Sequence, residues 1–169
     1  MEEIKEWPVG TEGGADKMKF YLCGSITGLK DGGESWRAQE MAWGTPMGYH
    51  YHNPSDQEII WARRFGVRRE ELLAGCRATP YDTRKELFKE IIHFDLKTIS
   101  ECNAVIAYVT KCSWGTASEI TWAFMLQIPV HIVLAPGAEL KPWPEACAVS
   151  VHTSFENLHE YLERTYAVY

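Results

Sequence analysis

The sequence predicts an α/β domain built around a parallel β-sheet, and three observations support this prediction. Residues 104–109 and 130–135 are nearly continuous apolar runs, which are typical of strands that helices cover on both faces. Residues 116–127, between these runs, are apolar almost all round, which indicates a buried crossover helix. Elsewhere short apolar runs alternate with helical patterns, as in sheets whose parallel strands are joined by helices.

Length, charge and composition narrow the possible functions. We expect a disordered leader over residues 1–17 and a single domain over residues 18–169 of this 169-residue chain. The net charge of -6 argues against a nucleic-acid polymer as partner, because a phosphate backbone needs a basic surface. No apolar run approaches the ~18 residues of a membrane span, so we expect a cytoplasmic protein without membrane contact. The five cysteines show no metal-ligand spacing, so we expect reduced thiols, no metal and no cofactor.

The first part of the chain predicts two strands separated by a loop and a helix. Residues 18–23 form the first predicted strand, and the glycine-containing loop 24–28 stops it. A helix is plausible over residues 34–43. Residues 49–52 predict a short second strand, which ends at Asn53-Pro54 because proline cannot continue a central ladder. The loop lacks the dinucleotide and P-loop spacings, but its amides and hydroxyls can bind a ribose or one phosphate.

Residues 55–81 allow two interpretations. The first is a solvated helix that Ser55 caps and that runs to Phe65, followed by a surface loop. The second is a lid that brings Trp61 or an arginine of the basic segment 63–69 to a ligand. We favour the first interpretation and keep the second open.

A long helical pattern follows Pro80, and one carboxylate interrupts its apolar face. Thr83 and Glu86 match a capping box at the start of this helix. One helical face contains the positions i, i+4, i+7 and i+11: Phe88, Ile92, Asp95 and Ile99. Burial on this face would raise the pKa of the Asp95 carboxyl group, and perturbed carboxylates cluster at working sites. The alternative is a structural Asp95 that accepts hydrogen bonds from a neighbouring loop.

Glu119 follows a glycine-containing turn near the start of the predicted helix 116–127. The helix dipole and unpaired N–H groups favour a carboxylate at that point. Thr116 and Glu119 also match a capping box, in which Glu119 would only satisfy a backbone N–H group. The pattern alone gives catalysis and capping equal weight. Residues 148–152 and 154–166 predict the last strand and a closing amphipathic helix.

The predicted functional residues converge at the carboxyl ends of the strands, where ligands bind in such sheets. Loop 24–28, Asn53-Pro54 and the turn before Glu119 meet at that edge. Two carboxylates in different protonation states suit glycosidic cleavage: Glu119 attacks or stabilises the anomeric carbon, and Asp95 handles the leaving group's proton. Tyr21, in the first strand, either orients Glu119 or packs with a polar tip.

Four motifs together resemble the nucleoside 2-deoxyribosyltransferase family: Tyr21-Leu22-Cys23-Gly24-Ser25-Ile26-Thr27-Gly28, His93-Phe94-Asp95-Leu96, Glu101-Cys102-Asn103-Ala104-Val105-Ile106-Ala107 and Ser113-Trp114-Gly115-Thr116-Ala117-Ser118-Glu119-Ile120. The resemblance covers residues 19–134, with a longer segment than usual over residues 53–82. It implies a flavodoxin-like, doubly wound parallel sheet of five strands. It also implies a homodimer or higher homo-oligomer with sites near subunit contacts, and cleavage of an N-glycosidic bond. Glu119 would be the nucleophile, Tyr21 would position it, and Asp95 would lie near the base or sugar.

Within this family, the chain looks closer to the 2′-deoxynucleoside 5′-monophosphate N-hydrolase branch. Transferases that act on free nucleosides often carry an acidic residue where this chain has Ser113, and an acid would repel a phosphate. The resemblance therefore implies a nucleotide site, although Thr27 stands where that branch tends to have an arginine. The substrate-binding candidates are Gly24, Ser25, Ile26, Asn53, Ser113 and Gly115, and the candidates for stacking on the base are Trp36, Arg37, Trp61 and Trp114.

The leading hypothesis is therefore cleavage of a (deoxy)nucleoside 5′-monophosphate, a small-molecule substrate, to release the free base. A transferase that exchanges bases on nucleosides is the close alternative. A non-catalytic module that senses nucleotides is a third possibility, and it predicts tight binding without base release.

Overall fold

The computed structural model describes residues 18–26, 29–111 and 113–166. The predicted leader over residues 1–17 and the loop residue Thr27 lie outside the described residues. In the described part of the chain, no helix has both the length and the apolar character needed to cross a bilayer.

Five parallel strands form one sheet in the order β2-β1-β3-β4-β5. The strands are β1 (Lys19–Gly24), β2 (His50–His52), β3 (Ala104–Val109), β4 (Val130–Leu134) and β5 (Ser150–His152). After β2 the chain crosses β1 to build the other half of the sheet, so the strand order reverses between β1 and β3. This order is flavodoxin-like, and it confirms the predicted fold class.

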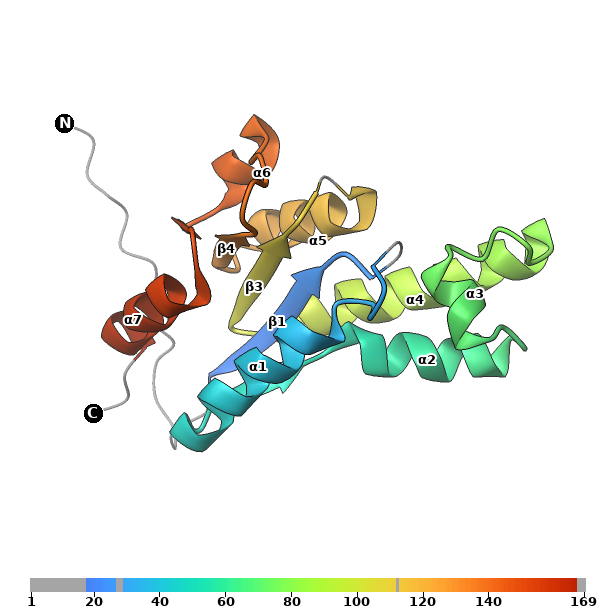
Figure 1. Ribbon diagram of the computed structural model, residues 1–169, viewed down its shortest axis with the longest axis horizontal. Helices are drawn as coiled ribbons and strands as arrows, with labels where there is room; N and C mark the ends of the chain where they lie inside the picture. Colours follow the sequence, from blue (N-terminus) through green and yellow to red (C-terminus); the bar gives the residue numbers. More distant parts are fainter. Residues whose placement is uncertain (1–17, 27–28, 112, 167–169) are drawn as a thin grey trace.

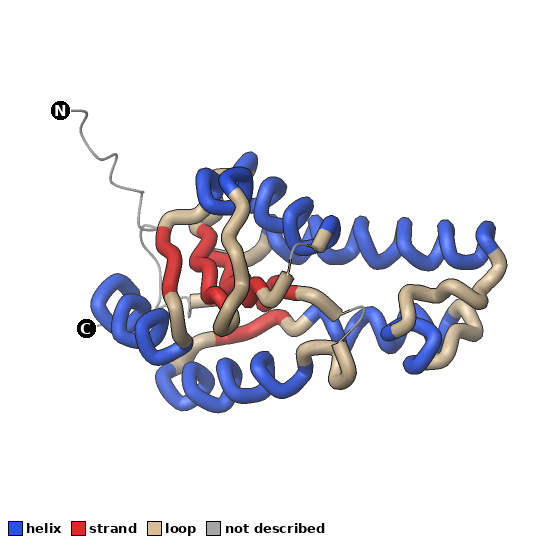
Figure 2. The backbone as a smooth tube through the Cα atoms, turned by 45° about the horizontal axis from the view of Figure 1, so that its top comes forward, coloured by secondary structure: helices blue, strands red, loops and turns tan. Residues whose placement is uncertain are grey.

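Helices cover both faces of the sheet (Figure 2). On one face, α1 (Glu34–Gly44) and α7 (Phe155–Tyr166) pack against Phe20 and Leu22 of β1. On the other face, α4 (Tyr81–Ser100) and α5 (Trp114–Met125) pack against Tyr21 and Cys23. Side chains alternate along a strand, so Tyr21 and Cys23 share the face that α5 covers. The chain also contains the short helices η1 (Thr45–Met47) and α6 (Pro142–Cys147).

Residues 54–93 form a helical extension beyond the sheet. In Figure 1, α2 (Pro54–Arg64), α3 (Arg69–Leu73) and the first part of α4 reach to the right of the strands. The extension has its own apolar core, made of Ala62, Val67, Leu72, Cys76, Leu87 and Ile91, with Trp61 packed against it. The predicted helix that runs to Phe65 is present as α2, but the predicted surface loop after it is wrong, because Val67, Leu72 and Cys76 are buried.

The helix starts differ from those that the capping patterns predicted. Asn53, not Ser55, caps α2, since its side-chain oxygen accepts a hydrogen bond from the Ser55 N–H at 3.1 Å. Helix α4 begins at Tyr81, so the predicted capping box of Thr83 and Glu86 lies inside the helix. Helix α5 begins at Trp114 with Ser113 as its N-cap, which places Glu119 a full turn inside the helix.

Candidate active site

A hollow of about 460 Å³ opens at the carboxyl end of the sheet, next to the point where the strand order reverses. Ligands bind at this place in doubly wound sheets. Four segments line the hollow: the loop after β1, the middle of α4, the start of α5 and the first two turns of α2. Their lining residues are Gly24, Ser25, Ile26, Pro54, Glu58, Phe88, Ile91, Ile92, Asp95, Leu96, Ser113, Trp114, Gly115, Thr116, Ser118 and Glu119.

Two side chains of β1 hold the Glu119 carboxylate. The Tyr21 hydroxyl donates a hydrogen bond to Oε1 of Glu119 at 2.7 Å. The Cys23 thiol donates to Oε2 at 3.0 Å. Both donors are fully buried in the face of the sheet under α5. Glu119 thus bonds to the neighbouring strand and does not cap its own helix, so the capping-box interpretation of Glu119 is wrong.

Burial and hydrogen bonding shift the pKa values of all three groups in this cluster. Burial is the main cause that raises the pKa of Tyr21 and of Cys23 well above their usual values, and the nearby Glu119 charge adds to it. Burial also raises the pKa of Glu119, while the bonds from Cys23 and Tyr21 lower it. Hydrogen bonds to the charged form favour ionisation, so this pair of donors fixes an oriented carboxylate.

Asp95 faces the same hollow from the middle of α4. Its side chain is buried, and this burial, together with the charge of Glu119, raises the pKa of Asp95 to about 9. The Tyr21 hydroxyl acts in the opposite direction. At neutral pH Asp95 is therefore protonated and presents an O–H donor beside Glu119. Asp95 and Glu119 thus line one hollow, where the sequence analysis expects both carboxyl groups.

Glu58 is a third carboxyl group at the hollow, and sequence reasoning missed it. It lies in the second turn of α2 and is partly buried. Burial and the neighbouring Glu119 raise the pKa of Glu58 to about 7, while the Arg37 guanidinium acts in the opposite direction. No sequence pattern identifies Glu58, because its approach to the hollow depends on how α2 packs against α3 and α4. No Lys or Arg is among the described residues that line the hollow.

Arg37 stabilises the end of β1 and the loop that follows it through hydrogen bonds to backbone carbonyl oxygens. Its buried guanidinium donates to the carbonyl oxygens of Leu22, Gly24, Gly32 and Gly33, at 2.9–3.3 Å. A Cβ at Gly24 would lie 3.0 Å from the Trp36 ring and from the Tyr108 carbonyl oxygen, so a larger residue there would force these neighbours to shift. The expectation that Trp36 and Arg37 stack on a base is wrong, since both side chains are buried and neither lines the hollow.

The other predicted binding residues divide into two groups. Gly24, Ser25, Ile26, Ser113 and Gly115 all line the hollow, and Ser113 makes no side-chain capping bond. Trp114 also lines it and is 92% exposed. Asn53 and Trp61 do not line it.

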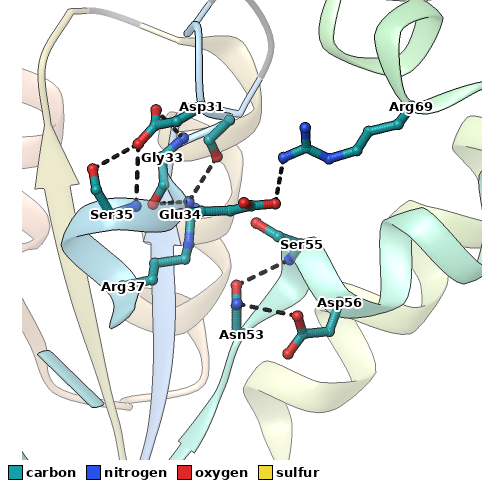
Figure 3. Close-up of polar contacts among 10 residues, drawn as sticks. Asp31, Gly33, Glu34, Ser35, Arg37, Asn53, Ser55, Asp56 and Arg69 are labelled. Carbon is teal, nitrogen blue, oxygen red and sulfur yellow. Dashed lines mark hydrogen bonds and ion pairs between the residues drawn. The ribbon is translucent and has the colours of Figure 1, made fainter. Parts of the chain in front are cut away.

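Polar contacts fix the entrance of α1 and the start of α2 (Figure 3). Asp31 accepts hydrogen bonds from the N–H of Gly33 and from the N–H and hydroxyl of Ser35, which lower the pKa of Asp31 to about 2. Asn53 caps α2 and donates to Asp56 at 3.4 Å. Glu34 pairs with Arg69, which links α1 to α3.

No metal site is visible in residues 18–26, 29–111 and 113–166, where no group of three His, Cys, Asp or Glu side chains could hold an ion. No family model matches the sequence. No curated protein matches it either.

The solved structures that resemble the chain include two enzymes. A 2-deoxyribosyltransferase from the psychrotolerant bacterium Bacillus psychrosaccharolyticus is similar with a TM-score of 0.55 and 15% sequence identity, over 85% of this chain and 91% of that one. A CMP N-glycosidase, BcmB, from Clostridium botulinum is similar with a TM-score of 0.49 and 13% identity, over 86% of this chain and 98% of that one. The similarity to the 2-deoxyribosyltransferase, at 15% identity, establishes a shared fold.

Proposed function

We propose that this protein is an enzyme that cleaves the N-glycosidic bond of a (deoxy)nucleoside 5′-monophosphate and releases the free base. The observation that carries the proposal is the Glu119 carboxylate, held at both oxygens by Tyr21 and Cys23 and facing a hollow beside Asp95. An ionised, oriented carboxylate next to a protonated one is what nucleophilic displacement at an anomeric carbon requires.

In the proposed reaction, Glu119 attacks C1′ of the sugar. The bond between C1′ and the base nitrogen breaks, and the base leaves with a proton from an acid at the hollow. The resulting ester between Glu119 and the sugar is then hydrolysed by water, which restores the carboxylate. Asp95, which carries a proton at neutral pH, donates a hydrogen bond to the sugar or the base during both steps.

The 5′-phosphate is the finer part of the proposal. Ser25 and Ser113 provide hydroxyl groups at the hollow, and the first N–H groups of α5 are unpaired within the helix. These groups can bind one phosphate at a helix N-terminus without a cation. The resemblance of the motifs to the monophosphate N-hydrolases also supports a nucleotide.

Transfer to a second base, in place of water, is the nearest alternative. The Bacillus protein that shares this fold is a 2-deoxyribosyltransferase, so the same scaffold supports that reaction in another chain. The distinction depends on whether water or a base reaches the glycosyl ester. A homodimer or higher oligomer is also proposed, because exposed apolar side chains (Trp114, Trp122, Met125 and Trp143) lie together beside the hollow.

Base release from a panel of substrates tests the proposal. The protein is incubated with nucleotides and unphosphorylated nucleosides, each with and without an acceptor base, and products are separated by chromatography. Release of base from monophosphates supports hydrolysis. Exchange of bases on unphosphorylated nucleosides would replace it with transfer.

A Glu119→Gln variant separates an enzyme from a nucleotide-sensing module. The amide keeps the shape of the side chain but is a poor nucleophile, so turnover should fall by at least ~10³-fold in an enzyme. Glu90→Gln is the matched control, because Glu90 is exposed on α4, away from the hollow. A sensor would bind nucleotides equally in both variants and would release no base from either.

A further inference from the structure

Three helices each bring one carboxyl group to the hollow: Glu119 from α5, Asp95 from α4 and Glu58 from α2. The reaction proposed above uses the first as nucleophile and the second as hydrogen-bond donor. It leaves open which group delivers a proton to the departing base and removes one from the incoming water. Glu58 is the carboxyl group to which no role has been assigned.

The position of Glu58 is set by packed structure. Asn53 caps α2 and Pro54 occupies its first position, so the helix starts directly at the end of β2. Ala62 and Leu72 then pack α2 and α3 against Leu87 and Ile91 of α4. Glu58 therefore faces the hollow from a helix that is fixed at its start and along its length.

Charged groups on several elements face Glu58. Glu119 and Asp95 face it across the hollow, and the Arg37 guanidinium lies close enough to act on it. On its other side, Glu34, at the start of α1, and Arg69, on α3, line a small cavity together with Glu58. Because Glu34 and Arg69 pair with each other, their charges largely cancel. The thiol of Cys76 is also close enough to sense its charge.

Glu58 also differs from Glu119 in its hydrogen bonds. Glu119 receives hydrogen bonds from Tyr21 and Cys23, whereas within the described residues Glu58 makes no side-chain hydrogen bond. A carboxyl group that lines a hollow without a protein partner can exchange its proton with a ligand.

We propose that Glu58 is the acid and base catalyst of this reaction: it protonates the departing base and then deprotonates the attacking water. This inference rests on the proposed N-glycosidase function. In the first step Glu119 bonds to C1′, the electron pair of the C1′–N bond goes to the base, and the proton of Glu58 goes to that base. In the second step the Glu58 carboxylate takes a proton from water, the water oxygen bonds to C1′, and the Glu119 ester bond breaks.

The protonation states of the three carboxyl groups agree with this division. A group that both gives and takes a proton works best when its pKa lies near the operating pH. The pKa of Glu58 is about 7, whereas that of Asp95 is about 9, so Asp95 stays protonated throughout. Burial raises the pKa of Glu119, and its two hydrogen-bond donors act in the opposite direction, towards the ionised state that attack requires.

The first test compares leaving bases in Glu58→Gln and wild type. The probes are guanosine 5′-monophosphate, whose base needs a proton to leave, and 7-methylguanosine 5′-monophosphate, whose cationic base leaves without one. We expect Glu58→Gln to slow release of guanine by about 10²- to 10⁴-fold. The 7-methylated nucleobase should be released in a rapid burst of about one molecule per enzyme molecule. Slow turnover should follow, because the second step still lacks the carboxylate that takes a proton from water. Azide, which attacks without losing a proton, should restore that turnover.

The second test uses whichever nucleotide the wild type cleaves. Activity as kcat/KM should fall as pH rises through about 7 in the wild type, because the acid form of Glu58 is lost. This alkaline limb should be absent in Glu58→Gln, present in Glu90→Gln and partly retained in Glu58→Asp, which still carries a carboxyl group. Thermal unfolding of each variant identifies a folding defect, and Glu58→Asp keeps the test decisive if Glu58→Gln unfolds.

Several results would overturn the inference. An active wild type with Glu58→Gln unchanged in rate and pH profile removes the role from Glu58 while the proposed function stands. The same is true if Asp95→Asn, not Glu58→Gln, shows the dependence on leaving base. If the wild type releases no base from any nucleotide or nucleoside, the proposed function fails first and the inference falls with it.

Discussion

The hydroxyl group of Tyr21 offers a quantitative test of how β1 holds the proposed nucleophile, Glu119. Tyr21→Phe removes the 2.7 Å bond to Oε1 of Glu119 and leaves the aromatic ring in place. A hydrogen bond to a charged group contributes about 1.5–3 kcal/mol. If the bond orients the attacking carboxylate, its loss should lower kcat/KM by about 10- to 150-fold, because each 1.36 kcal/mol is a factor of ten.

The same substitution should also shift the pH dependence of kcat/KM in a defined direction. The bond from Tyr21 lowers the pKa of Glu119, so removing it raises that pKa further. Attack needs ionised Glu119, and activity is lost as pH falls through its pKa. The acidic limb of the kcat/KM profile should therefore move to higher pH in Tyr21→Phe.

The assay is base release measured across the pH range in wild type, Tyr21→Phe and Tyr49→Phe. Tyr49 is the matched control, because it is buried on the opposite face of the sheet beside Phe20. A Tyr21→Phe enzyme with wild-type kcat/KM and an unmoved acidic limb would refute the reasoning that β1 activates Glu119.

Three further predictions follow from the same geometry. Cys23→Ala should reduce kcat/KM and move the acidic limb to higher pH, by less than Tyr21→Phe does, because a thiol is a weaker hydrogen-bond donor than a hydroxyl group. The control Cys102→Ala should change neither quantity, and equal pH profiles for Cys23→Ala and wild type would contradict the prediction. Asp95→Asn should retain more activity than Asp95→Ala in base-release assays, since the amide keeps a donor where Asp95 is protonated; the reverse order would show that Asp95 acts as a charge. Arg37→Leu should lower the free energy of unfolding by more than about 2 kcal/mol in urea titrations, because four carbonyl oxygens lose a buried donor; an unchanged midpoint would show that water replaces it.

The sheet could be predicted because its strands carry a strong, local signal. Val105 and Ile132 belong to apolar runs that are typical of strands covered on both faces. The alternation of side chains along β1 also allows a further prediction. It places Cys23 on the same face as Tyr21, so the thiol donor to Glu119 could have been predicted with it.

The start of α5 shows where local patterns are ambiguous. Ser113 and Thr116 can both serve as an N-cap, and a glutamate three residues after Thr116 completes a plausible capping box. Tertiary contacts determine the partners of Glu119, because the Tyr21 hydroxyl and the Cys23 thiol both donate hydrogen bonds to it. A short-range rule cannot include a strand that lies 96–98 residues away in the chain.

The role of the helical extension depended on packing that no periodicity specifies. The direction of α2 is set by contacts of Ala62 with residues of α3 and α4, so the sequence alone does not place Glu58 at the hollow. The burial of Arg37 is a similar case. Its environment follows from the loop carbonyls of Gly24, Gly32 and Gly33, which need a donor only once the loop has folded.

The most direct test of the central claim is a crystal structure of Glu119→Gln with an intact nucleotide in the hollow. The account predicts that the side-chain oxygen of residue 119 lies about 3–3.5 Å from C1′, on the face opposite the base, as reacting atoms do before attack. A nucleotide bound with C1′ out of reach of residue 119, or nearer to Asp95 or Glu58, would contradict it.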